Sequence, residues 1–132
     1  MRYFLFCTLL MLLIFNRLFS QENKSEPKYS MQKYYFVFLK TGPNGNDTTG
    51  NSEIFKGHMA HIKEMAASGK LKLAGPFADA GDLEGFFIFD VSTPDEAQKL
   101  CDEDPAVKSG KLVTEIVQWY GPKGLTVIPD KQ

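Results

Sequence analysis

Arginine is almost absent from this chain of 132 residues, because its only two, Arg2 and Arg17, both lie within the first 20 residues. The remaining residues carry 13 lysines and 16 acidic side chains, a net charge of −3. Binding of nucleic acid normally depends on arginine side chains and on a basic surface. We therefore expect no nucleic-acid partner.

Cysteine is equally scarce, with only Cys7 near the N-terminus and Cys101 near the other end. A folded domain that holds Cys101 alone has no intramolecular disulfide, so its stability must come from a hydrophobic core. Cys101 falls next to Leu100 in a predicted helix. We expect a small buried apolar side chain there rather than a reactive thiol.

The sequence has no glycine-rich phosphate loop, no nucleotide-binding fingerprint, no Ser-His-Asp order and no paired zinc-ligand motif. Nucleotide-dependent and hydrolytic enzymes therefore have no support, and we predict no cofactor. His58 and His61 lie one helical turn apart, and with Asp79 they offer three side chains of metal-ligand type. This pattern alone is weak, and we predict no metal site.

The N-terminal segment differs from the rest of the chain. Arg2 precedes a largely apolar run from Tyr3 to Phe15, and the small residue Ser20 precedes a polar stretch. Because a membrane-spanning helix needs about 20 apolar residues, this run favours a secretory signal peptide over residues 1–20. The protein is then secreted or periplasmic without stable membrane insertion, and an uncleaved N-terminal anchor is the alternative. Residues 21–32 are expected to be a linker.

Alternating and helical patterns predict four strands and two helices after the linker. The strands are expected at 33–40, 70–74, 86–91 and 112–120, and the helices at 52–68 and from Thr93 to about Asp104. This β-α-β-β-α-β order predicts an α+β, ferredoxin-like domain over residues 33–121, followed by a tail at 122–132. The turn-forming residues 41–50 are expected to be a flexible loop.

Three short motifs set the expected ends of these elements. Gly69 is expected to end the first helix, and Thr93 followed by Pro94 and Glu96 predicts a capped start for the second. Gly75 and Pro76 are expected to break the second strand, either to turn the chain so that Asp79 comes back toward the first helix or as an ordinary strand terminator.

The first strand has large apolar side chains on both of its faces. Tyr34, Phe36 and Phe38 alternate with Tyr35, Val37 and Leu39. The helices of one domain cover only one face of its sheet, so the other face needs another partner. We predict a homodimer in which two sheets pack face to face.

His58 and Asp79 are the predicted catalytic residues. His58 shares the apolar stripe of the first helix with Ile54 and Ile62, and Asp79 follows the turn at Gly75 and Pro76. An aspartate that accepts a hydrogen bond from one imidazole nitrogen leaves the other nitrogen as a base near neutral pH. The alternative is a core histidine whose hydrogen bond to Asp79 has only a structural role.

The chain resembles the YciI-like (YCII-related) family from Tyr34 to Tyr120. The resemblance rests on His58, Gly69 to Leu71, Ala74 to Pro76, Asp79, Glu96 and Ala97, Asp104 to Val107, Gly110, and Glu115 to Trp119. It implies a dimeric α+β barrel with a His-Asp dyad, carried over to His58 and Asp79. It also implies a small-molecule ligand, since one branch resembles dehydrochlorinases of chlorinated hydroxyquinols.

We thus expect an exported enzyme that uses acid-base chemistry for an isomerisation or an elimination. A non-catalytic ligand-binding or dimeric interaction module on the same scaffold is the alternative. A cofactor-free oxygenase is a third hypothesis, and no residue in the sequence favours it. Saturable binding without product would favour the module, and oxygen consumption would favour the oxygenase.

Overall fold

The computed structural model describes residues 29–79 and 81–126. The predicted signal peptide, most of the predicted linker and the end of the predicted tail lie outside the described residues. The elements are β1 (Met31–Thr41), α2 (Asn51–Ala67), β2 (Leu71–Pro76), β3 (Leu83–Phe89), α3 (Pro94–Asp102), α4 (Pro105–Lys108) and β4 (Leu112–Pro122). β1 begins at Met31, inside the stretch predicted to be a linker.

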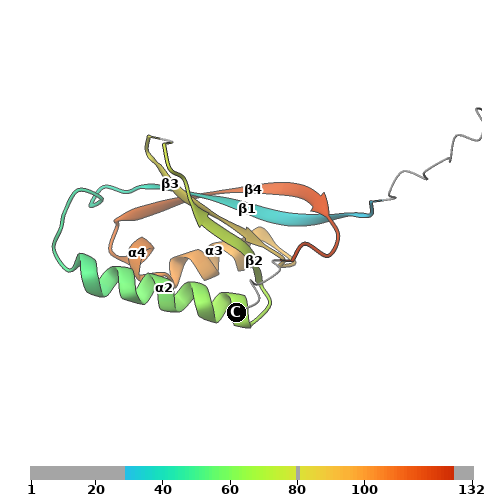
Figure 1. Cartoon of the computed structure of the whole chain (residues 1–132), viewed down its shortest axis with the longest axis horizontal. Coiled ribbons are helices and arrows are strands. Elements are labelled where there is room, and N and C mark those ends of the chain that lie inside the picture. Colours follow the sequence, from blue (N-terminus) through green and yellow to red (C-terminus); the bar gives the residue numbers. More distant parts are fainter. Residues whose placement is uncertain (1–28, 80, 127–132) are drawn as a thin grey trace, which may run out of the picture.

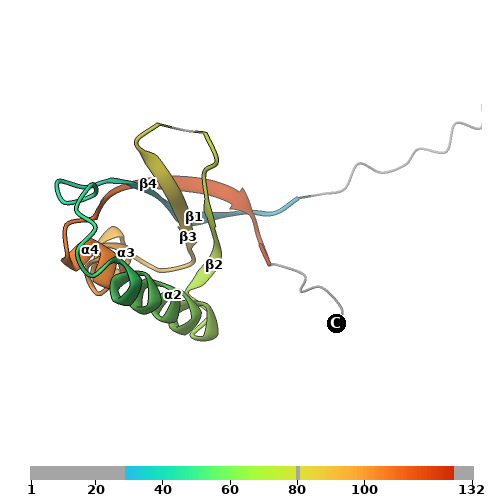
Figure 2. The ribbon, with the colours of Figure 1, turned by 60° about the vertical axis from the view of Figure 1, so that its left-hand side comes forward.

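The four strands form one antiparallel sheet in the order β2-β3-β1-β4. All three described helices lie on the same side of this sheet (Figures 1 and 2). The predicted fold class, an α+β domain with ferredoxin-like topology, is confirmed. None of the helices in residues 29–79 and 81–126 is long and apolar enough to span a membrane.

The hydrophobic core lies between the helices and the covered face of the sheet. β1 contributes alternate side chains to it, and β3 contributes two phenylalanines. Its buried members are Tyr35, Val37, Leu39, Met65, Leu71, Phe87, Phe89, Ala97 and Cys101. These alternate positions explain why both strands are apolar, since the intervening residues point to the other face.

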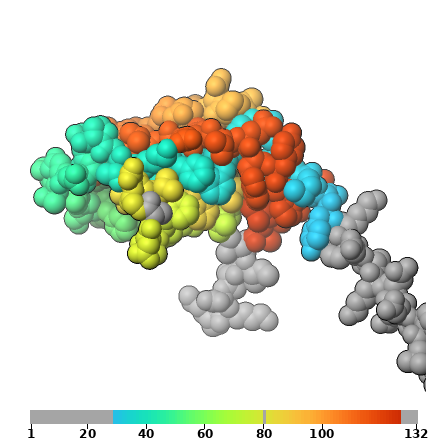
Figure 3. All heavy atoms as spheres, turned by 90° about the horizontal axis from the view of Figure 1, so that it is seen from above, coloured from blue at the N-terminus to red at the C-terminus, as the bar shows by residue number. Residues whose placement is uncertain are grey.

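The other face of the sheet carries an aromatic cluster that no helix covers. The ring of Phe36 lies 5.3 Å from that of Phe86 and 6.5 Å from that of Trp119. Val113 and Val117 of β4 are 41% and 38% exposed. Figure 3 looks onto the sheet from above, and atoms of β1 and β4 lie uncovered in that view.

The start of α3 follows the predicted capping pattern. The Thr93 side chain accepts a hydrogen bond from the Glu96 backbone N–H at 3.2 Å, and Pro94 occupies the first helical position. The Glu96 carboxylate in turn accepts from the backbone N–H of Ser92 at 3.3 Å. The end of α2 also agrees, because Gly69 follows it with a positive φ of 77°.

The predicted break at Gly75 and Pro76 is wrong. β2 continues through both residues, which pair with Phe86 and Gly85 of β3. Proline has no backbone N–H to donate, and it is tolerated here because β2 is an edge strand whose outer side has no ladder partner in the sheet. The chain therefore turns only after Pro76.

The short third helix, α4, was not predicted. The Asp104 side chain caps it by accepting a hydrogen bond from the Ala106 backbone N–H at 2.8 Å, and Pro105 stands at its first position. α4 links α3 to β4, and Gly110 turns the chain with a φ of 73°. This extra turn of helix places a buried carboxylate beneath α2.

Candidate functional site

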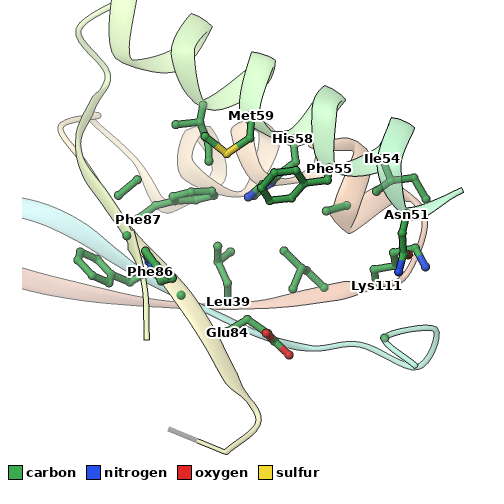
Figure 4. Close-up of a pocket in the computed structure, with 18 residues that line it drawn as sticks. Leu39, Asn51, Ile54, Phe55, His58, Met59, Glu84, Phe86, Phe87 and Lys111 are labelled. Carbon is green, nitrogen blue, oxygen red and sulfur yellow. The ribbon is translucent and has the colours of Figure 1, made fainter. Parts of the chain in front are cut away.

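A pocket of about 810 Å³ lies between α2 and the sheet. α2 contributes Phe55 and His58, β3 contributes Phe87, and Lys111 stands just before β4 (Figure 4). The complete lining is Leu39, Gly45, Asn51, Ile54, Phe55, His58, Met59, Ile62, Ala74, Gly75, Pro76, Glu84, Gly85, Phe86, Phe87, Ala106, Lys111 and Leu112. The pocket is thus largely apolar, with few polar groups that could orient a ligand.

His58 is held in the pocket wall by a hydrogen bond and by an aromatic contact. Its Nδ1 lies 2.7 Å from Oδ2 of Asp104, and its side chain is only 13% exposed. Its ring lies 6.2 Å from the ring of Phe87, with 30° between the two planes. One face and one edge of the imidazole are therefore fixed by neighbours.

Asp104 is completely buried, and both of its oxygens have partners. Oδ1 accepts from the Ala106 backbone N–H at 2.8 Å, and Oδ2 faces Nδ1 of His58. An ionised carboxylate only accepts hydrogen bonds, so Nδ1 of His58 must carry the hydrogen. The neutral ring then has its lone pair on Nε2.

Nε2 of His58 is the group that a ligand can reach. In the described part of the chain it has no hydrogen-bond partner, and no buried side-chain nitrogen or oxygen there lacks one. Nε2 is therefore accessible, and His58 lines the pocket. An imidazole whose tautomer is fixed by a carboxylate is suited to accept a proton from a bound molecule.

A close contact between α2 and α4 brings the two residues together. A Cβ atom built on Gly57 would lie 3.0 Å from Cγ of Pro105, so a larger residue would press the helices apart. Gly57 precedes His58, and Pro105 follows Asp104. The missing side chain of Gly57 thus helps to set the distance between imidazole and carboxylate.

The predicted pairing of His58 with Asp79 is wrong, because His58 pairs with Asp104. Asp79 is exposed in the connection between β2 and β3, whereas the hydrogen bond of His58 goes to Asp104. The physical reason is that β2 does not break at Gly75, so the hairpin carries Asp79 beyond the strand end. A catalytic role for Asp79 stays an untested prediction.

His61 has a structural contact instead of a place in the pocket. Its Nε2 lies 2.8 Å from the backbone carbonyl oxygen of Leu100, to which it can donate, so it ties α2 to α3. Residues 29–79 and 81–126 contain no group of three or more His, Cys, Asp or Glu side chains arranged to hold a metal ion.

Cys101 is a core residue, as predicted. It is fully buried in the cluster between the helices and the sheet. Burial raises the pKa of its thiol to about 12, and the negative charges of Asp102 and Asp104 add to this effect. The thiolate needed for nucleophilic chemistry is thus disfavoured.

Sequence reasoning missed Asp104 and the aromatic wall formed by Phe55 and Phe87. The signal for Asp104 was the Asp-Pro step, since aspartate before proline is a frequent helix start. In the sequence the same step coincides with the expected end of the helix that begins at Thr93. Phe87 belongs to an apolar strand, and nothing in the sequence separates a pocket phenylalanine from a core one.

Comparisons with known proteins agree with this architecture. Residues 34–120 match the family described as the YCII-related domain. The uncharacterized protein YjpA of Bacillus subtilis (strain 168) is 32% identical over 69 residues, which are 52% of this chain and 79% of YjpA.

A solved structure has the same fold. It is that of 5-chloro-2-hydroxyhydroquinone dehydrochlorinase (TftG) from Burkholderia phenoliruptrix AC1100, in complex with 2,5-dihydroxybenzoquinone. The TM-score is 0.52, with 65% of this chain and 92% of TftG covered at 22% identity. At that identity the likeness extends to the fold alone.

Proposed function

Because this chain belongs to the YCII-related family, we propose that it is a small-molecule enzyme in which His58 transfers a proton. The observation that carries the proposal is the accessible Nε2 of His58 in a largely apolar pocket, with Nδ1 held by the buried Asp104. This arrangement supplies a base without a cofactor or a covalent nucleophile.

The proposed step is the removal of a proton from an acidic carbon or hydroxyl group of the substrate. Nε2 takes the proton, and Asp104 stabilises the imidazolium that forms. The electron pair left on the substrate then shifts to make a double bond. Return of the proton elsewhere gives an isomerisation, and departure of a leaving group with its electron pair gives an elimination. The name of the structural relative TftG, a dehydrochlorinase, fits the second outcome.

The experiment is a search for turnover in D₂O with a panel of small cyclic enols, lactones and halogenated hydroquinones. The proposal predicts product, or deuterium uptake at an acidic carbon, for at least one compound. Mass spectrometry and proton NMR detect both. Saturable binding of panel members without product or exchange would favour the non-catalytic ligand-binding module instead.

We also propose that the protein is a homodimer joined through the uncovered face of the sheet. Phe36 and Trp119 form part of an aromatic cluster there, next to the half-exposed Val117. An apolar face of this kind is costly in water, and a second copy brings the same side chains to cover it.

Substitution Val117→Lys is expected to give a monomer, because a lysine in this interface would be buried without a partner. Light scattering during size-exclusion chromatography should report half the mass of the wild type. Gln118→Lys is the matched control, since Gln118 is exposed and pairs with Tyr35, whose side chain faces the helices. A monomeric wild type, or a Val117→Lys variant that stays dimeric, would refute the interface.

Export through a cleaved N-terminal signal is part of the proposal. It is supported by Arg2, the apolar run from Tyr3 to Phe15 and Ser20 before the polar stretch. Mass spectrometry of the protein from its own cells should find a mature chain that begins at Gln21. A chain that begins at Met1 would favour the uncleaved anchor.

A further inference from the structure

The pocket beside His58 is elongated along α2. Its α2 residues follow each other at spacings of three and four, from Asn51 through Phe55 and His58 to Ile62. At 1.5 Å per residue, this stripe is about 16 Å long. Its volume of about 810 Å³ lies in the upper part of the range found for small-molecule sites. Such a pocket favours a ligand longer than one ring.

One end of this pocket carries a half-buried cation, Lys111. Its ammonium group donates a hydrogen bond to the backbone carbonyl of Asp47, a neutral acceptor. Asp47 lies four residues before Asn51, so the bond places the ammonium near the Asn51 end of the stripe. Figure 4 shows Lys111 and Asn51 at the same end of the pocket. Lys111 makes no ion pair with any side chain in the described part of the chain.

The opposite charge in the pocket lining belongs to Glu84, which is exposed. Its carboxylate accepts a hydrogen bond from the Thr41 hydroxyl at 2.6 Å. Water screens an exposed charge more strongly than a half-buried one. The charge of Lys111 also interacts with the exposed Asp47 carboxylate and contributes to the lowered pKa of Asp47, but that carboxylate lies outside the pocket lining and is too far away to form an ion pair. Lys111 is therefore the stronger charge toward a molecule bound in the pocket, and the pocket favours anions over cations.

We propose that the ligand is an elongated organic anion with an apolar body. Its carboxylate or sulfonate group contacts Lys111, and its body lies along Phe55, Met59 and Ile62. His58 lines the middle of the stripe, where the reacting atom would stand. Only this last placement rests on the proposed function, since binding of the anion requires no chemistry.

The probe for this site is 8-anilinonaphthalene-1-sulfonate, an apolar fluorophore with one negative charge. We expect saturable binding with enhanced fluorescence, and a loss of affinity of about tenfold in Lys111→Gln, because a charge-assisted hydrogen bond is lost. N-Phenyl-1-naphthylamine has a similar body without the charge. Its affinity should change by less than about twofold in the same variant, since only the charge is removed. Fluorescence titrations of folded protein, checked by circular dichroism, measure both.

Two further variants locate the binding. Lys108→Gln removes an exposed lysine outside the pocket and should leave both affinities within about twofold, because long-range charge effects are screened. Met59→Gln should weaken both probes, since it places an amide against the apolar body. The proposal is overturned if the sulfonate probe shows no saturable binding, or if Lys111→Gln lowers the affinity for both probes equally. It is also overturned if Lys108→Gln lowers the affinity for the sulfonate probe as much as Lys111→Gln does.

Failure of this inference and failure of the proposed function are distinguishable. His58→Gln should keep the binding of the sulfonate probe while it loses turnover. A His58→Gln variant with full turnover would contradict the base, whereas unchanged sulfonate affinity in Lys111→Gln would contradict only the anion site.

Discussion

Replacing His58 with glutamine is expected to lower kcat by about 10²- to 10⁴-fold for any substrate found in the panel, because the base of the proton transfer is lost. The fold should survive, since the glutamine amide can donate to Asp104 as Nδ1 of His58 does. Steady-state kinetics, together with a thermal melt of the same sample, test both expectations.

The matched control is His61→Gln, which makes the same exchange one helical turn later. His61 lies outside the pocket lining and bonds to the Leu100 carbonyl, an acceptor that a glutamine amide can also use. Its kcat should stay within about threefold of the wild type, because no group at the reacting atoms is changed. Full turnover in His58→Gln would end the proposal that His58 is the base.

Substitution Asp104→Ala is expected to reduce the free energy of unfolding by about 2 to 4 kcal/mol. It removes the cap of α4, and it leaves the Ala106 N–H and Nδ1 of His58 without a partner in the interior. Chemical denaturation at one fixed protein concentration gives the difference. The concentration must be fixed because dimerisation would contribute to stability.

Asp102→Ala makes the same exchange two residues earlier, at an exposed position. Among residues 29–79 and 81–126, the Asp102 carboxylate accepts a side-chain hydrogen bond from Gln98 alone, at 2.7 Å on the surface of α3. Its loss should cost less than about 0.5 kcal/mol. If Asp104→Ala were no less stable than Asp102→Ala, the buried carboxylate would not hold the site together.

Local patterns were sufficient to predict the order of the elements and several of their ends. The capping residues of α3 act over four consecutive positions, so the sequence contains the whole interaction. The same is true of Gly69, whose positive φ ends α2. The alternating residues of β1 indicated two buried faces, and the core on one face and the aromatic cluster on the other agree with that pattern.

The partner of His58 could not be predicted in the same way. Asp104 is 46 residues from His58 and reaches it through the contact of Gly57 with Pro105, a tertiary contact between two helices. Asp79 is nearer in sequence, but its position depends on where β2 ends. The end of β2 is set by its pairing with β3, and an edge strand such as β2 can include a proline. No local motif in the sequence predicts this pairing.

The position of the positive charge at one end of the pocket also depends on tertiary structure. Lys111 enters the pocket because α4 leads into β4 next to the loop that carries Asp47. In the sequence it is one of 13 lysines, and nothing distinguishes it from Lys108 three residues earlier.

The most direct measurement of the central claim is the tautomer of His58 in the folded protein. Long-range ¹H–¹⁵N correlation NMR of the neutral imidazole distinguishes a hydrogen on Nδ1 from one on Nε2. We predict the hydrogen on Nδ1 in the wild type, because the Asp104 carboxylate can only accept. In Asp104→Asn the amide keeps the cap of α4 but can donate to Nδ1, so the hydrogen should move to Nε2 and turnover should fall. A wild-type His58 with its hydrogen on Nε2 would have no lone pair facing the pocket, and it would contradict the proposed base.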